Sequence, residues 1–439
     1  MSGIDIAPQS QGQDIDLATT FQLISTIFSK VSSPAFRRKE RDFTRHGPLD
    51  PELLTTLLLY MVADGNRRGY QGLLTGFWDE ARSYGLALPT EDAVSGASFC
   101  TARRKVTSDL LRRLIHEASD TFDESFGEPL RWYGRRIFAV DGTKVNLQRS
   151  QDLDKAYGTP HGAHCPQVLL SVLLDLCGKV PVDLQISPFA SSERDHLFAM
   201  LPRLKAGDVL VLDRGYPSHE VLQALVKAKI DFLIRVPSSS TFSAIDLIQH
   251  CQGNDYRVLI DPPDSSPEDW QDLELRALRL KNRAGEESYF LTTLRRVDFS
   301  GAQIGDLYHL RWEAEEFFKL LKGPYIGQGQ FRSKSPEGVR QEMHALVLFL
   351  AISRFLMATA ARVNDADFNS LSQKAAVLAI ADYITRLFLY NDPSIAACHL
   401  RALLQRIANA RYRKRAGRSF LRVSFKPSKR WGPKGRRGA

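Results

Sequence analysis

The 439-residue sequence has few cysteines and no long hydrophobic run. Its five cysteines are scattered and form no Cys-x-x-Cys pair, which argues against a disulfide framework or a structural zinc site. The longest largely apolar runs, 168–174 and 345–352, fall short of the roughly 18 residues that a membrane span needs. The N-terminus lacks the basic and apolar segments of a signal peptide. We therefore expect a cytoplasmic protein without a membrane partner.

Acidic residues are absent from residues 401–439, which hold 14 of the 59 Lys and Arg residues. The remaining 400 residues carry 45 basic and 50 acidic side chains, so the net charge of +9 comes from this end of the chain. A concentrated run of positive charge suits a polyanion, and nucleic acid is the usual one. A solvated tail without a specific partner is the alternative. With 43% hydrophobic and 25% charged residues, the rest has ordinary globular composition, enough for two or three domains.

Helical periodicity begins after Pro48. Asp50-Pro51 is typical of a helix start, because Asp caps the first turn and proline suits its first position. Two further helices are expected, one from Tyr70 and one over 110–119.

A short helix over 95–105 ends in three consecutive basic residues, Arg103, Arg104 and Lys105. It fits the recognition element of a helix-turn-helix, with these three residues on DNA. It fits equally well a helical bundle with a basic rim, and the sequence leaves both interpretations open.

Residues 136–236 change to a mixed pattern with the order β, β, β, α, β, α, β. The second and third strands, 168–176 and 180–186, are joined by a tight turn that predicts a hairpin. Residues 237–302 are expected to form a β-rich insertion, and from Gln303 the chain is helical nearly to residue 410.

Two aspartates share a local pattern that suits a metal site. Asp141 and Asp213 each follow an apolar run that we read as a strand, and each has a glycine one or two residues later. Carboxylates at the ends of neighbouring strands would meet at one edge of a sheet, and Mg²⁺ prefers carboxylate oxygens. Aspartate also ends many strands simply because it favours turns.

The helix from Gln303 adds a third carboxylate. On a helical wheel one face carries a tyrosine, an arginine, a glutamate and two lysines: Tyr308, Arg311, Glu315, Lys319 and Lys322. Two other glutamates, at 313 and 316, fall away from this face. By itself the stripe could be a surface helix with ion pairs. With two strand-end aspartates upstream, it favours a two-metal site for nucleic acid.

Three motifs together resemble the DDE transposases of the "insertion sequence four" group. They are Asp141-Gly142-Thr143, Asp213-Arg214-Gly215-Tyr216 and the spaced set Tyr308-x2-Arg311-x3-Glu315-x6-Lys322. The resemblance covers roughly residues 50–425. It implies an α/β fold with an RNase H-like mixed-sheet core. The first Asp would lie on the first strand, the second after the fourth, and the Glu on a later helix.

The resemblance also implies a function, that of a bacterial insertion-sequence transposase. Asp141, Asp213 and Glu315 would be catalytic and would hold two Mg²⁺ ions, with Mn²⁺ as a substitute. Tyr308, Arg311 and Lys322 would contact DNA at the element end, and we place Lys319 on the same face. The partners would be element ends and target DNA, bound by a homodimer on paired ends, in the cytoplasm and near the nucleoid. A nuclease of the same fold without mobility and a non-catalytic, transposase-derived DNA-binding protein are the alternatives.

The expected organisation follows from these patterns, listed in chain order. It is a partly disordered segment 1–47, a helical DNA-binding domain 48–130, the first part of the core 131–236, a β-rich insertion 237–302, a catalytic helix 303–330, C-terminal helices 331–410 and a basic tail 411–439. One further acid, Glu193, would lie near the core, either supporting the site or starting an exposed helix.

Overall fold

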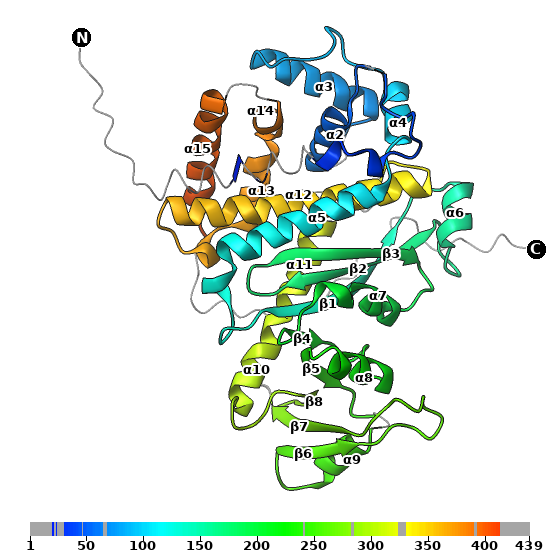
Figure 1. Ribbon diagram of the computed structural model, residues 1–439, viewed down its shortest axis with the longest axis vertical. Helices are drawn as coiled ribbons and strands as arrows, with labels where there is room; N and C mark the ends of the chain where they lie inside the picture. Colours follow the sequence, from blue (N-terminus) through cyan, green and yellow to red (C-terminus); the bar gives the residue numbers. More distant parts are fainter. Residues whose placement is uncertain are drawn as a thin grey trace, which may run out of the picture.

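An eight-stranded mixed sheet with helices on both faces forms the body of the protein (Figure 1). The computed structural model describes residues 20–21, 23, 30–45, 47–64, 68–239, 242–281, 285–323, 331–389 and 393–412. The strand order is β3-β2-β1-β4-β5-β8-β7-β6. The strands are β1 Ile137–Asn146, β2 Gln167–Asp175, β3 Val180–Pro188, β4 Val209–Leu212, β5 Asp231–Val236, β6 Asp255–Ile260, β7 Leu273–Lys281 and β8 Glu287–Thr292.

The first five strands confirm the expected RNase H-like core. β1, β2 and β3 form an antiparallel meander, whereas β4 and β5 run parallel to β1. Asp141 lies on the first strand, Asp213 directly follows the fourth, and Glu315 lies on a later helix. The hairpin is confirmed as β2 and β3. The strands of 237–302 extend the same sheet, because β8 pairs antiparallel with β5.

The helices cover the sheet in two layers. Alternate residues of β1 belong to different cores: Ile137 and Ala139 pack toward α12 and α5, and Phe138 and Val140 pack toward α7 and α8. The helices are α2 Pro51–Ala63, α3 Tyr70–Ser83, α4 Gly96–Arg103, α5 Ser108–Phe122, α6 Gln151–Tyr157, α7 Glu193–Met200, α8 His219–Lys227, α9 Ser243–His250, α10 Gly301–Leu310, α11 Trp312–Lys322, α12 Pro336–Val363, α13 Gln373–Ala381, α14 Ile384–Phe388 and α15 Pro393–Asn409. Short helical turns η1 Pro34–Phe36, η2 Asp123–Gly127, η3 Glu128–Leu130, η4 Leu201–Arg203 and η5 Phe368–Ser370 complete the list.

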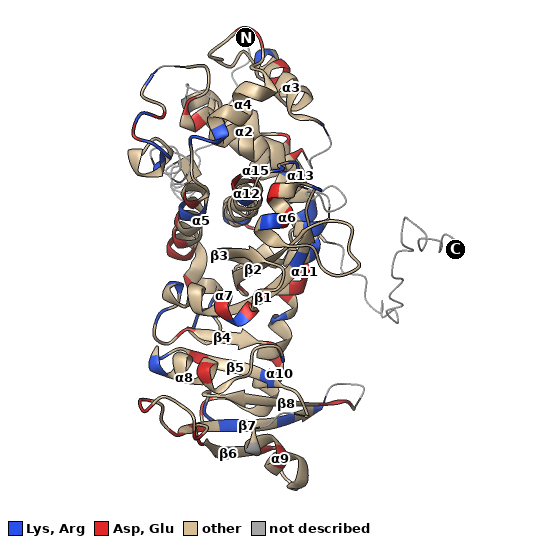
Figure 2. Cartoon of the chain, turned by 90° about the vertical axis from the view of Figure 1, so that its right-hand side faces the viewer, with Lys and Arg blue, Asp and Glu red and all other residues tan. Residues whose placement is uncertain are grey.

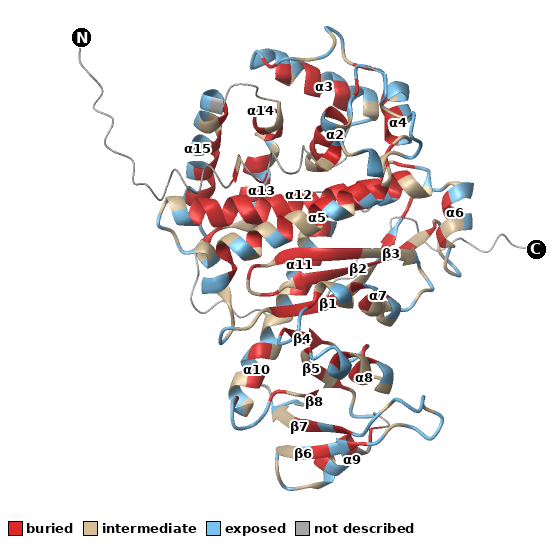
Figure 3. Cartoon of the chain, in the orientation of Figure 1, coloured by how far each residue is buried: buried red, intermediate tan, exposed pale blue. Residues whose placement is uncertain are grey.

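Helix α12 is the central helix of the larger core. In the described part of the chain it alone is long and apolar enough to cross a membrane, but 89% of its most apolar window is buried inside the protein. It packs against α5, α2, α15 and β3, and its buried surface runs nearly its whole length (Figure 3). Its composition is therefore that of a core helix surrounded by protein on all sides.

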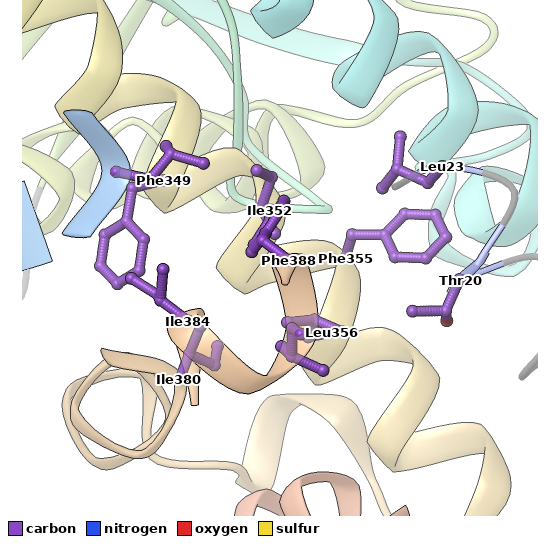
Figure 4. A pocket seen from close by; sticks show the side chains of 11 residues that line it. Thr20, Leu23, Phe349, Ile352, Phe355, Leu356, Ile380, Ile384 and Phe388 are labelled. Atoms are coloured by element: carbon purple, nitrogen blue, oxygen red, sulfur yellow. The ribbon is translucent and has the colours of Figure 1, made fainter. Parts of the chain in front are cut away.

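One pocket beside α12 is small. It lies between α12, α14 and the residues Thr20 and Leu23 (Figure 4), and its volume is about 10 Å³. Its lining is almost wholly apolar, with Phe349, Phe355 and Phe388 among its residues. A space of this size holds at most one water molecule.

Several local expectations are confirmed and others need correction. Asp50 caps α2 by accepting a hydrogen bond from the Leu53 amide, as predicted. Asp141 does not end its strand, because β1 continues to Asn146 through pairing with β2. The helix expected from Gln303 is divided in two, and α10 and α11 meet at Arg311. Helices α6 and α9 were not predicted. Most of the expected N-terminal segment and basic tail lies outside the described residues.

The placement of Arg103 contradicts its expected role on DNA. Its side chain is 5% exposed and forms an ion pair with the fully buried Glu342 of α12, with Nη1 3.0 Å from Oε1. The same guanidinium donates to Gln341 Oε1 and to the Gly338 carbonyl. Arg103 is thus a structural tie between α4 and α12. Arg104 beside it is exposed, and the Lys105 ammonium lies over the Phe43 ring.

Removing Arg103 should therefore destabilise the protein. Arg103→Ala leaves Glu342 as an uncompensated buried charge, so the free energy of unfolding should fall by about 3–5 kcal/mol. The exposed neighbour offers a matched control, because Arg104→Ala should change stability by no more than about 0.5 kcal/mol. Urea unfolding followed by circular dichroism measures both. Equal, small effects would show that the buried pair does not hold α4 to α12.

Candidate active site

The two aspartates lie where β1 and β4 part. These strands pair only over 137–139, and β1 then continues with β2 alone. The alternation of buried residues along both strands places Asp141 and Asp213 on the same face of the sheet, the face that α11 covers. We call this place the fork. It brings two carboxylates from distant parts of the sequence to one sheet edge.

Backbone and side-chain donors fix both aspartates at the fork. Asp141 Oδ1 accepts a hydrogen bond from the Gly142 amide at 2.9 Å. Asp213 Oδ1 accepts one from the Arg214 amide at 2.8 Å and one from the Tyr308 hydroxyl at 3.0 Å. Tyr308 therefore contacts a carboxylate, and burial, followed by the charge of Asp213, raises its pKa to about 12. The hydroxyl stays protonated and keeps donating at neutral pH.

Arg311 lies among all three predicted carboxylates. Its Nη2 is 2.7 Å from Glu315 Oε1 and its Nη1 is 3.8 Å from Asp141 Oδ2, while Asp213 also acts on its charge. The side chain is 12% exposed, and its Nε is buried without a hydrogen-bond partner among the described residues. Glu313 points elsewhere, toward Lys179 at 3.0 Å. The structure thus brings Glu315 to the fork and not Glu313.

The surroundings of Asp141 at the fork raise its pKa. Burial raises the pKa of Asp141 to about 6, against the attraction of Arg311, and the charges of Glu193 and Asp213 add to the rise. A carboxylate in this position favours its protonated form unless a cation is near. The chemistry of the donor set, oxygen atoms of several acids beside one guanidinium, therefore suits a hard divalent cation.

The fork is not a closed metal cage. Across the described ranges, no three His, Cys, Asp or Glu side chains stand together as a ready-made metal site. Mg²⁺ does not require one, because it takes one or two carboxylates and completes its shell with water and phosphate. Asp141, Asp213 and Glu315 fit that requirement. Glu315 is held by Arg311 in this structure.

The two predicted lysines of α11 lie differently. Lys322, in the last turn, is exposed and within electrostatic reach of Asp141. Lys319 pairs with Glu316 and lies over the Trp312 ring at 5.3 Å, not beside Glu315 as the wheel suggested. It borders a separate cavity of about 510 Å³. That cavity is also lined by three other cations: Lys179, Arg354 and Lys374. Figure 2 shows both signs of charge along α11.

The sequence interpretation left the role of Glu193 undecided. It is the first residue of α7, and its carboxylate packs against Gly142 and accepts a hydrogen bond from Tyr216. Both partners belong to the aspartate motifs. A glycine after the first aspartate and a tyrosine after the second were the available signals, but spacing alone did not connect them to Glu193.

The family comparison covers this whole site. Residues 132–352, half of the chain, match the family model described as the transposase DDE domain. This chain belongs to that family. The matched range contains Asp141, Asp213 and Glu315 together with the fork that carries them.

Two individual proteins that resemble this chain share little sequence identity with it. The transposase InsG for insertion sequence element IS4 of Escherichia coli (strain K12) is 23% identical over 277 residues, which are 60% of this chain and 61% of that protein. The chain thus matches less than two thirds of the length of this relative. A cryo-EM structure of the piggyBac transposase synaptic complex with hairpin DNA is 10% identical with a TM-score of 0.45, covering 93% of this chain and 87% of the other. The fold is therefore defined by the strand order and pairing alone.

The raised pKa of Asp141 predicts a pH-dependent stability. Between pH 4 and pH 6 the folded, metal-free protein holds a proton that the unfolded chain has lost, so stability from this group falls as pH rises through that window. Asp141→Asn stays neutral, and in EDTA at pH 8 it should be more stable than wild type by about 1–3 kcal/mol. At pH 4 the difference should nearly vanish. Urea unfolding at the two pH values measures it.

An exposed aspartate gives the control for this experiment. Asp264→Asn, in the loop between β6 and β7, should leave stability within about 0.5 kcal/mol at both pH values. A gain for Asp141→Asn that is the same at pH 4 and pH 8 would show that it does not come from carboxylate ionisation.

Proposed function

We propose that this protein is a DNA transposase of a bacterial insertion sequence. It cleaves phosphodiester bonds at the ends of the element and joins the freed 3′-hydroxyl groups to target DNA. The observation that carries the proposal is the convergence of Asp141, Asp213 and Glu315 on Arg311 within the matched family domain. A site that gathers acids around one buried guanidinium suits divalent cations and phosphate together.

The metal would be held by Asp141, Asp213 and Glu315. Two Mg²⁺ ions bound there, or Mn²⁺ in their place, would activate the attacking oxygen and offset the charge on the phosphate. Two features of the fork favour metal binding. Tyr308 holds Asp213 by its hydroxyl, and the raised pKa of Asp141 means that its negative charge is poorly satisfied without a cation.

The cations of α10 and α11 would bind the DNA backbone. Arg311 keeps one buried donor, Nε, for which the described structure offers no acceptor. A guanidinium can donate two parallel hydrogen bonds to a phosphate, so a phosphate oxygen entering the fork fits this donor. Lys322 lies exposed two turns after Glu315 and would contribute a point charge. Lys319, Arg104 and Lys105 would contribute outside the fork.

DNA is accordingly the expected partner, in two forms: element ends and target. Joining requires that two cut ends be held together, so we propose a homodimer on paired ends. Location in the bacterial cytoplasm, near the nucleoid, follows from the same partner.

Replacing each carboxylate tests the reaction. Asp141→Asn, Asp213→Asn and Glu315→Gln should each abolish strand cleavage while binding to the element end persists, because each removes a metal ligand but no cation. Glu313→Gln is the matched control on the same helix. It loses only a partly exposed ion pair with Lys179 and should cleave nearly as wild type. Cleavage and gel-shift assays on end DNA measure both properties.

The outcomes separate the alternatives. Cleavage within about tenfold of wild type would remove the altered residue from the catalytic set. Cleavage without joining to a target would indicate a nuclease without mobility. Binding without cleavage by the wild-type protein would indicate a DNA-binding protein that has lost catalysis.

The basic tail provides a separate prediction. Residues 413–439 hold 11 Lys and Arg residues, and a cut after Tyr412 keeps the backbone contacts of Arg411 and Tyr412 with 370–371. If the tail contacts phosphates, its deletion should lower non-specific DNA affinity and reduce the log–log salt slope by about 0.9 for each lost contact. Fluorescence anisotropy across a salt series measures the slope. An unchanged slope would mean that the tail does not touch DNA.

A further inference from the structure

Glu193 packs against the backbone next to Asp141. It begins α7, a helix that lies beside β1 (Figure 2). A Cβ atom added at Gly142 would lie 2.6 Å from Glu193 Cδ and 2.7 Å from its Oε1. Real Cβ atoms do not approach other atoms so closely, so no other residue fits at 142 while the carboxylate keeps this position. The glycine of the first motif therefore makes room for Glu193.

The second motif holds the same carboxylate. The hydroxyl of Tyr216, a residue only 2% exposed, donates to Glu193 Oε2 at 3.1 Å. The neighbouring Arg194 donates to the carbonyls of Gly215 at 3.2 Å and Pro217 at 3.1 Å. The start of α7 is thereby tied to the turn that follows Asp213. Glu193 is fixed between the two aspartate segments.

The Glu193 carboxylate is half-buried and lies close enough to Asp141 for their charges to interact. Within the described chain, no Lys, Arg or His forms an ion pair with Glu193, and Tyr216 is its one hydrogen-bond donor, so Oε1 has none. Its negative charge contributes to the raised pKa of Asp141. A carboxylate oxygen without a donor is suited to a hard divalent cation, which takes oxygen ligands. Arg311, the guanidinium at the fork, is engaged with Glu315 and Asp141.

We propose that Glu193 is a fourth carboxylate of the metal site, binding a divalent cation together with Asp141. The inference rests on the proposed function, which supplies the cation. Glu193 approaches the fork from the α7 face of the sheet and Glu315 from the α11 face. Gly142 and Tyr216 are positioning residues: the glycine admits the carboxylate, and the tyrosine holds Oε2 and leaves Oε1 for the cation.

Manganese binding without DNA tests this role. Free Mn²⁺ is followed by electron paramagnetic resonance during titration of the full-length protein. Glu193→Gln should lower Mn²⁺ affinity at least about tenfold, because an amide oxygen replaces a charged ligand. Gly142→Ala should lower it as well, since the new methyl group displaces the carboxylate. Asp195→Asn, an exposed acid in the first turn of the same helix, should stay within about twofold of wild type.

The other outcomes overturn the proposal in distinguishable ways. If Glu193→Gln and Tyr216→Phe lower the melting temperature but leave Mn²⁺ affinity unchanged, Glu193 is a structural acceptor and not a ligand. Asp141→Asn tests the metal site of the proposed function. If it lowers Mn²⁺ affinity and Glu193→Gln does not, only the fourth carboxylate is wrong. If neither changes the affinity, the metal site at the fork is wrong as a whole.

Discussion

The gathering of three carboxylates around one guanidinium is the constraint on which the arrangement of this site depends. Asp141, Asp213 and Glu315 come from β1, the end of β4 and α11, and they meet around Arg311. One guanidinium carries a single positive charge against three acids. Burial raises the pKa of Asp141, and the charges of Glu193 and Asp213 add to the rise. The surrounding structure must therefore hold the acids together against their own repulsion. Clustered acids of this kind cost stability, and proteins retain such costs chiefly at functional sites.

The sheet and two helices supply that support. Because β1 and β4 stop pairing after Ala139, the aspartates have space beyond the last shared hydrogen bonds, while β2 and β5 keep both strands in place. Helix α11 is anchored by buried residues on one side, Ala314, Phe317 and Leu321. That anchoring sets its rotation, so Glu315 faces the fork and Glu313, half a turn away, reaches Lys179 instead. The chemistry thus depends on apolar packing behind the helix.

Much of this could be predicted from local pattern. Alternating and helical periodicity identified the hairpin, the two aspartate-bearing segments and the charged face of α11, because each is specified by residues close in sequence. The rotation that favours Glu315 over Glu313 follows from the same spacing. The continuous eight-stranded sheet was not predictable, since nothing in 237–302 says which strand its own strands will pair with. The same holds for β1, whose length beyond Asp141 is set by β2.

Charge was the least predictable property. Arg103, Arg104 and Lys105 are equivalent in the sequence, but the first is buried against Glu342, 239 residues away, and the second is exposed. A basic run therefore does not mark a DNA surface until its partners are known. The Arg103–Glu342 pair has a further consequence, since it joins α4 to α12 and hence to the sheet. Any DNA contact by Arg104 is then made from an element attached to the catalytic core.

The motifs show the same dependence on distant partners. Their acids can be recognised from chemistry alone, because carboxylates after apolar strands suggest metal. Gly142 and Tyr216 offer no metal-binding group, and their spacing in the sequence does not indicate what they do. One side chain outside either motif, Glu193, contacts both. Gly142 leaves space for its carboxylate, and the Tyr216 hydroxyl donates a hydrogen bond to it. A motif residue without evident chemistry can thus indicate where an unrecognised participant lies.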